Sequence, residues 1–366
     1  MAEISLCMIV RDERETLARC LDSVKEAVDE IIIVDTGSRD ETREIALRYT
    51  PHVYDFPWKD DFSAARNEAF AHASCDFLMW LDADDVVEDA GILMRFKQER
   101  LDGFDVVMAP YHVAFDAHGK PTFTYYRERI LRAGMGFRWE GAVHEAIAPR
   151  GRIGYAEFVV RHEKLHSGEP GRNLRIYEKL LAQGHSFNPR ERFYYGRELA
   201  SAGRVEAAAR QLDSVIDDET AWIENRIEAC AGLADSLDRL GDPGGAMRAL
   251  CRSLALDRPR PMIACALGSR FLKTGNLPAA RFWYEAALSA KENEKSGAFI
   301  QRDHTGRIPL LQLCVIHDRL GEREVACAYN EQAALLCPDD EAVQQNRRYF
   351  ERLGIRRKEE WPESRA

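Results

Sequence analysis

The sequence predicts two structural parts, an α/β part with a mostly parallel sheet followed by an all-α part built from helical repeats. Up to about residue 168, short apolar runs rich in Ile and Val alternate with segments of helical periodicity, which is typical of a parallel sheet covered by helices. From about Asn188 the sequence becomes Ala- and Leu-rich helix. The 366 residues allow each part its own core. We place the parts at 1–168 and 188–350, with a linker or helix at 169–187 and a flexible tail at 351–366.

The first part contains apolar runs that predict strands at residues 4–10, 31–34, 52–56 and 77–81. Between the first two runs, Leu17, Leu21 and Val24 recur at helical spacing. After the second run, Ser38 and Glu41 have the spacing of a capping box, which predicts that a helix begins there. This order of strands and helices predicts a Rossmann-like sheet.

Polar clusters follow several of these strands, namely Arg11-Asp12-Glu13, Asp35-Thr36-Gly37 and Asp82-Ala83-Asp84-Asp85. An isolated Asp-x-Asp is often only a solvated turn. However, the carboxyl ends of parallel strands meet at one edge of a sheet, where ligands bind. Carboxylates at such an edge suit Mg²⁺ or Mn²⁺, and a nucleotide diphosphate with its metal is often held by one or two of them. The clusters together therefore predict a site.

The second part contains a repeat marked by glycines in polar turns. Gly203, Gly241, Gly275 and Gly321 are each followed five positions later by an alanine, at Ala208, Ala246, Ala280 and Ala326. The intervals between glycines 203, 241, 275 and 321 are 38, 34 and 46 residues. A period near 34 is typical of tetratricopeptide repeats, although plain antiparallel helix hairpins with alanine contacts could also produce it. The longer last interval predicts an insertion around 291–307.

Composition excludes several classes of protein. The net charge of −10 argues against general nucleic-acid binding. The nine cysteines contain no Cys-x-x-Cys pair, so no zinc ribbon or thioredoxin-like motif is indicated. No apolar run approaches the roughly 20 residues of a membrane span, and no export signal is evident. We therefore expect a cytoplasmic protein with reduced thiols and no transmembrane segment.

The motifs of the first part resemble those of family 2 inverting glycosyltransferases, which have the GT-A fold. The resemblance covers about residues 3–168 and rests on SLCMIVRDE at 5–13, IIVDTGSRD at 32–40, WKDDFSAARN at 58–67 and DADD at 82–85. With the helical repeats, the chain is similar to bacterial peptide S-glycosyltransferases of the sublancin type and to transferases of lipopolysaccharide cores. The resemblance implies a nucleotide-sugar donor and Mn²⁺ or Mg²⁺.

The resemblance also implies roles in donor binding. Asp35 would accept a hydrogen bond from uracil N3–H, which favours a UDP-sugar, and Glu13 would bind the ribose. Asp82 would reach the ribose or the metal, and Arg66 would bind the phosphates. The full set on the donor side is Val10, Arg11, Glu13, Asp35, Arg66, Asn67, Asp82, Ala83, Trp139 and His144. The metal ligands would be Asp82, Asp84 and His162, the last at the end of a predicted strand.

An inverting transfer needs a base that takes the proton of the attacking group. Glu145 is the first candidate, Glu140 the second and Asp85 the third. Trp139 would form an apolar wall under the sugar ring, and His144 would touch the phosphate or the acceptor. Glu145 could equally be a structural salt-bridge partner.

Other functions fit the sequence less well. Nucleotidyl transferases and dinucleotide-dependent dehydrogenases need glycine-rich loops after a strand, and Arg11-Asp12-Glu13 is acidic and lacks glycine. A remaining alternative is a non-catalytic, peptide-binding repeat protein on a degenerate transferase scaffold. We expect the repeats to bind a polypeptide or saccharide acceptor or to form a homodimer. The sequence does not distinguish these acceptors or identify the sugar.

Overall fold

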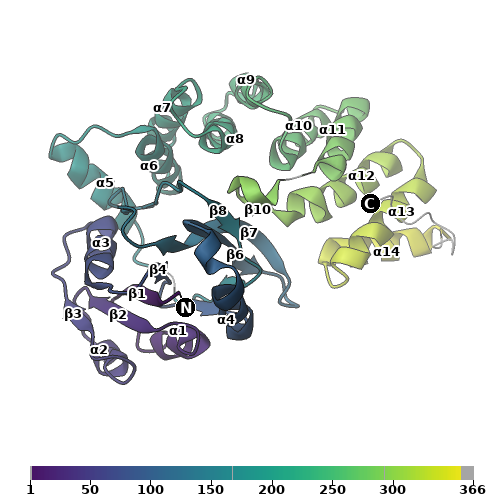
Figure 1. Ribbon diagram of the computed structural model, residues 1–366. Coiled ribbons are helices and arrows are strands. Elements are labelled where there is room, and N and C mark those ends of the chain that lie inside the picture. The colour runs from purple at the N-terminus through teal and green to yellow at the C-terminus, as the bar shows by residue number, and fades with distance from the viewer. Residues whose placement is uncertain (1, 167, 292, 356–366) are drawn as a thin grey trace. The chain divides into compact units, whose positions relative to one another are not determined.

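A computed structural model describes residues 2–166, 168–291 and 293–355 (Figure 1). The chain divides into two compact units. The first comprises Met1–Tyr194 and Glu294–Ile300, and the second comprises Tyr195–Asn293 and Gln301–Ala366. The first unit thus continues past residue 168 and regains a short segment from the second half. Residues 356–366, most of the predicted tail, lie outside the described residues.

The first unit is built on a ten-stranded sheet with the order β3-β2-β1-β4-β7-β6-β9-β5, to which β8 and β10 are added beside β6 and β7. The strands are β1 (Ile4–Val10), β2 (Glu30–Asp35), β3 (Val53–Asp55), β4 (Phe77–Trp80), β5 (Asp85–Val87), β6 (Val106–Phe115), β7 (Pro121–Arg132), β8 (Ile153–Tyr155), β9 (Val160–His162) and β10 (Ile300–Gln301). β1 to β4 are parallel, whereas β7 is antiparallel to β4 and β6. The predicted α/β class is confirmed, but the sheet is mixed and the long β6–β7 hairpin was not predicted.

Both faces of the sheet are covered. The helices of this unit are α1 (Leu17–Val24), α2 (Thr42–Ala46), α3 (Phe62–His72), α4 (Ala90–Glu99), α5 (Arg172–Ala182) and the start of α6 (Pro189–Ser201), as far as Tyr194. On one face, alternate residues of β1 from Ile4 to Val10 share a buried core with Leu21 of α1. On the other face, Cys7 shares a second core with Ala69 of α3. Successive residues of β1 therefore point to opposite layers.

The capping box predicted at the start of α2 is wrong. Glu41 occupies the N-cap position and makes no side-chain capping bond. Instead, Asp40 Oδ1 accepts a hydrogen bond from Thr42 N at 3.0 Å. Ser38 Oγ accepts a hydrogen bond from Asp12 N at 3.1 Å. This bond joins the loop after β2 to the loop after β1.

The second unit consists of helices around the glycine turns. They are α7 (Val205–Ile216), α8 (Ile223–Arg239), α9 (Pro243–Ser253), α10 (Pro261–Lys273), α11 (Leu277–Ser289), α12 (Arg307–Arg319), α13 (Arg323–Leu336) and α14 (Glu341–Arg352). Gly203, Gly241, Gly275 and Gly321 precede α7, α9, α11 and α13 with φ of 77, 79, 77 and 82°, respectively. The alanines five positions later are all 0% exposed. Each turn requires a residue that adopts a left-handed conformation, and each helix crossing requires a small residue. The glycines and alanines meet these two requirements, so the predicted repeat is confirmed.

The long interval before Gly321 contains two 3₁₀ turns, Glu294–Ser296 and Arg302–Thr305, with β10 between them. Its segment Glu294–Ile300 belongs to the first unit. All nine cysteines lie in the described part of the chain and are free thiols. Within the described residues, no helix has the length and apolar character needed to cross a membrane.

Candidate functional site

The loops after β1 and β2 are joined at the edge of the sheet where these strands end. Thr36 donates from its backbone N and its hydroxyl to the Val10 carbonyl at 3.0 and 3.1 Å. Arg39 N donates to Asp12 Oδ1 at 2.7 Å, and Glu13 N donates to Thr42 Oγ1 at 2.7 Å. The loops predicted to converge therefore form one rigid edge.

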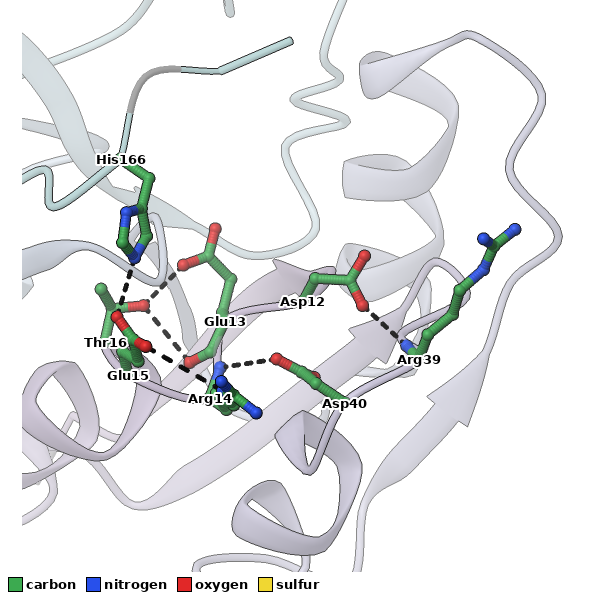
Figure 2. Close-up of a pocket in the computed structure, with 8 residues that line it drawn as sticks. All are labelled: Asp12, Glu13, Arg14, Glu15, Thr16, Arg39, Asp40 and His166. Atoms are coloured by element: carbon green, nitrogen blue, oxygen red, sulfur yellow. Dashed lines mark hydrogen bonds and ion pairs between the residues drawn. The ribbon is translucent and has the colours of Figure 1, made fainter.

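A pocket of 370 Å³ opens beside this edge. It is lined by Asp12, Glu13, Arg14, Glu15, Thr16, Arg39, Asp40 and His166. Figure 2 shows His166 reaching across to Glu15, with 2.7 Å between Nε2 and Oε2, while the Arg39 guanidinium extends away from the other side chains. Asp12 has a φ of 54°, uncommon for a residue with a side chain. The predicted ligand Arg11 adjoins the pocket, is half exposed and lies 3.9 Å from Asp12 Oδ2 through its Nε.

Asp35 terminates β2 and organises the turn that follows. Its Oδ1 accepts hydrogen bonds from Gly37 N at 2.9 Å and Ser38 N at 2.8 Å. The residue is 4% exposed, and Gly37 has a φ of 104°, which favours glycine. Asp35 thus has a structural role in addition to the predicted contact with a nucleobase.

Asp84, Asp85 and His162 form a group of side chains that could hold a metal ion. Their ligating atoms all lie within 4.8 Å of one another. Asp85 and His162 are register partners in the antiparallel pair β5–β9. His162 Nδ1 lies 3.4 Å from Asp84 Oδ1 and 3.3 Å from Asp85 Oδ1. Carboxylate oxygens with one imidazole nitrogen are suitable ligands for Mn²⁺ and Mg²⁺.

The charge of this region also fits a divalent cation. Burial, followed by repulsion from Asp82 and Asp85, raises the pKa of Asp84, although His162 opposes the shift. Burial and the charges of Asp84 and Asp82 likewise raise the pKa of Glu13. Because negative charge is concentrated on these carboxylates, a bound cation would relieve the repulsion.

Asp82 belongs to a different arrangement from the other two acids of its motif. Arg66 of α3 donates Nη2 to Asp82 Oδ1 at 2.6 Å and Nε to Glu145 Oε1 at 2.7 Å. Burial disfavours the charged form of Asp82, but the charge and hydrogen bond of Arg66, together with the charges of Arg129 and His162, outweigh it and lower the Asp82 pKa to about 2. The guanidinium also lies 4.8 Å from the centre of the Trp139 ring. Arg66, predicted to bind phosphate, is thus held by two carboxylates and an aromatic ring.

Arg66 nevertheless keeps one nitrogen for a further contact. Its Nη1 is buried and has no hydrogen-bond partner among the described residues. Ala83, the residue between the first two acids, lies in the turn between β4 and β5 and is 4% exposed. A ligand could contact that turn mainly through its backbone.

Asp85 is enclosed and is therefore unsuitable as the base. Its Oδ2 pairs with Arg129 Nη1 at 3.0 Å, and both side chains are 0% exposed. Tyr111 Oη donates to Asp85 Oδ1 at 2.8 Å, and Asp82 N donates to Asp85 Oδ2 at 3.1 Å. An acceptor cannot reach a carboxylate buried in this way, so the prediction that placed Asp85 third among the bases is not supported. Arg129 and Tyr111 were not predicted from the sequence, because they lie on the unpredicted β6–β7 hairpin.

The predicted sugar wall at Trp139 needs correction. The residue is 2% exposed, and its ring contacts the Trp80 ring edge-on at 4.9 Å. Asn67 binds its backbone on both sides, donating Nδ2 to the Trp139 carbonyl at 3.0 Å and accepting from Trp139 N at 2.9 Å. Because Trp139 is buried, its ring cannot contact a sugar, and Asn67 holds its backbone in place.

The loop that carries the two remaining base candidates is closed by a β-bridge between Glu140 and Ala146. The Glu140 side chain is exposed, whereas the Glu145 side chain is 12% exposed and pairs with Arg66. His144 lies in the same loop, with its ring stacked on Tyr194. The structure therefore places Glu145, rather than Glu140, in contact with the other site residues.

Comparisons with known proteins identify the family of this chain. The family model described as glycosyl transferase family 2 matches residues 5–148. The chain is 31% identical over 322 residues to a TPR repeat-containing protein of Synechococcus elongatus, covering 84% of this chain and 72% of that protein. It is 28% identical over 239 residues to the SPbeta prophage-derived glycosyltransferase SunS of Bacillus subtilis, covering 61% and 55%, respectively. It is 26% identical over 164 residues to the lipopolysaccharide core biosynthesis glycosyltransferase LpsC of Rhizobium meliloti, covering 42% and 60%. The chain thus spans little more than half the length of SunS and LpsC.

Proposed function

Because this chain belongs to glycosyl transferase family 2 and is a glycosyltransferase, we propose that it moves a sugar from a UDP-sugar to a polypeptide or saccharide acceptor, with inversion and with Mn²⁺ or Mg²⁺. One observation carries the proposal. Asp84, Asp85 and His162 place their ligating atoms within 4.8 Å of one another, and the charges of Asp84 and Asp82 act on Glu13 beside the pocket.

Asp84 and His162 are the side chains that would hold the cation, with Asp85 behind them. A bound divalent ion neutralises charge on a diphosphate leaving group. Arg66 fixes Asp82 at the rim of the same site, and its buried Nη1 is a further donor for the donor substrate. Asp35 and Glu13 would bind the uridine.

Glu145 is the proposed base. The acceptor's O–H or S–H proton would pass to its carboxylate as the acceptor atom bonds to the anomeric carbon. The bond from that carbon to the diphosphate would break, and its electron pair would leave with UDP. The ion pair with Arg66 holds the carboxylate beside Asp82, which supports Glu145 over the exposed Glu140.

The proposal also covers the acceptor and the assembly of the protein. Arrays of helical repeats offer concave surfaces that bind extended peptides, whereas LpsC is named for lipopolysaccharide core biosynthesis. Free thiols support action in the reducing cytoplasm. A homodimer formed through the repeats remains a prediction, which sedimentation would test.

The competing proposal is a degenerate scaffold whose repeats alone bind peptides. It would require damage to the metal-binding or base positions. Asp84, His162 and Glu145 are instead present and in contact with charged neighbours, so the enzyme is favoured.

Nucleotide binding provides the first test. Thermal shift and calorimetry would compare UDP, GDP and dTDP with Mn²⁺ and with chelator. At one hundred times its Kd, a ligand stabilises the protein by about 2.7 kcal/mol. We expect Mn²⁺-dependent UDP binding that is lost in Asp84→Ala and kept in Asp22→Ala, which removes an exposed carboxylate paired with Lys25. UDP binding that is equal with chelator, or equal in Asp84→Ala, would contradict the metal site.

A further inference from the structure

The residue before the proposed base has a strained backbone. His144 has a φ of 52°, in the left-handed region that side chains disfavour. Such a conformation is energetically unfavourable and persists only where its surroundings impose it. The groups that impose it here therefore also determine where Glu145 lies.

The strained backbone is held by α6. Arg190 donates both Nε and Nη2 to the His144 carbonyl, each at 3.2 Å. The His144 ring stacks on Tyr194, with ring centres 4.2 Å apart and planes 12° apart. The Arg190 guanidinium lies 4.8 Å from the centre of the same tyrosine ring. Arg190, His144 and Tyr194 thus form one stacked and hydrogen-bonded group.

Helix α5 adds support on the other side of the strained residue. Tyr177 Oη donates to the Val143 carbonyl at 3.4 Å. Asn173 Nδ2 lies 3.5 Å from His144 Nε2. Both helices follow residue 148, where the match to the family model ends. The backbone of the base loop is therefore held by helices that lie outside the residues matched by the family model.

The carboxylate of Glu145 is held by a contact that is separate from those on the His144 backbone. Its Oε1 accepts from Arg66 Nε at 2.7 Å, and the Glu140–Ala146 bridge closes the loop behind it. Arg66 fixes the side chain, whereas Arg190 fixes the backbone from which that side chain projects. The two contacts together restrict both the backbone and the side chain of this part of the loop.

We propose that Arg190 is a positioning residue for the glycosyl transfer: it fixes the His144 backbone and so orients the Glu145 carboxylate toward the acceptor. This inference rests on the proposed function, in which Glu145 takes the acceptor proton. The planar guanidinium suits the task because it offers two donors in a fixed geometry, which a lysine ammonium does not reproduce. In this role Arg190 acts through the His144 backbone, to which it donates two hydrogen bonds.

The test compares Arg190→Ala and Arg190→Lys with the wild type. Arg175→Ala is the matched control, because Arg175 lies on α5 and pairs with the exposed Glu169. Hydrogen exchange of residues 140–147 reports the loop, and calorimetry with UDP and Mn²⁺ reports the donor site. UDP release from UDP-glucose and UDP-N-acetylglucosamine, with water as acceptor, reports turnover.

We expect faster exchange of the loop in Arg190→Ala, UDP affinity within about threefold of the wild type, and kcat lower by about 10- to 100-fold. Added guanidinium should restore part of kcat in Arg190→Ala but not in Arg175→Ala, and Arg190→Lys should recover less than half. A general loss of folding would lower UDP affinity and kcat together and would not be rescued.

Unchanged loop exchange in Arg190→Ala would overturn the inference whatever the activity. So would a kcat equal to that of the wild type. If the wild type binds no UDP, the proposed function is contradicted. The hydrogen-exchange data would still show separately whether Arg190 holds the loop.

Discussion

Arg66 and Glu145, separated by 79 residues in the chain, meet at 2.7 Å through Nε and Oε1. The same guanidinium binds Asp82 at 2.6 Å. One buried cation therefore links the proposed base to the first acid of the Asp-x-Asp motif. The relationship makes the two carboxylates interdependent, because loss of Arg66 would leave both without their counter-charge.

Replacing Arg66 by Met should destabilise the protein by about 3–5 kcal/mol, because two carboxylates would lose their buried partner. Denaturant unfolding would measure the loss. Adding Asp82→Asn and Glu145→Gln to Arg66→Met should recover part of it, since the uncompensated charges would be gone. Additive losses in this cycle would show that the three side chains do not interact.

Replacing Glu145 by Gln should abolish transfer while preserving donor binding. The amide retains the shape of the side chain but cannot accept the acceptor proton, so kcat should fall by about 10²–10⁴-fold. Calorimetry with UDP and Mn²⁺ should give an affinity near that of the wild type. Glu140→Gln is the matched control and should keep activity within a few fold. The opposite result for the two variants would transfer the base role to Glu140.

Replacing Tyr111 by Phe should weaken the cation site while leaving Asp84, Asp85 and His162 in place. The variant loses the hydroxyl that donates to Asp85 Oδ1 at 2.8 Å, and outer partners of metal ligands typically contribute 10- to 100-fold in affinity. Mn²⁺ titration in the presence of UDP would measure it. Tyr125→Phe should bind Mn²⁺ normally, because its hydroxyl interacts with Arg127 instead. Equal losses in both variants would indicate a general effect on the sheet.

The elements recovered from the sequence are those specified by local patterns. β1 was predictable because its residues from Ile4 to Val10 form an apolar run, which needs no knowledge of distant partners. The repeat was predictable because Gly203 must adopt a positive φ and Ala208 must be small. Polar residues following parallel strands also indicated the edge of the sheet where the site lies.

The contacts within the site were not predictable in the same way. Arg129 and Asp85 are 44 residues apart and form a fully buried pair. From the sequence alone, a single arginine in a strand is expected to lie on the surface. The motif containing Arg66 and Asn67 indicated that these residues gather near the donor. It did not indicate that Arg66 faces carboxylates and Asn67 faces the Trp139 backbone, because orientation depends on tertiary packing.

Glu228 of α8 makes the stability of the second unit depend on pH. Burial raises the pKa of Glu228 from 4.5 to about 7, and Arg197 only partly opposes the shift. Between these values the folded state keeps a proton that the unfolded state has lost, so stability falls as pH rises from 4.5 to about 7. Glu228→Gln cannot ionise. We therefore expect its free energy of unfolding, relative to the wild type, to increase by about 1–3 kcal/mol between roughly pH 5 and pH 8.

Chemical denaturation at these two pH values measures the difference. Glu224→Gln is the matched control on the same helix, because Glu224 Oε1 accepts from Arg260 Nη2 at 2.8 Å. Removing that partner of Arg260 should destabilise the protein at both pH values. An offset between Glu228→Gln and the wild type that is the same at both pH values would mean that Glu228 does not titrate in this range. A difference between Glu228→Gln and the wild type that increases with pH would show that burial of this carboxyl destabilises the repeat at neutral pH.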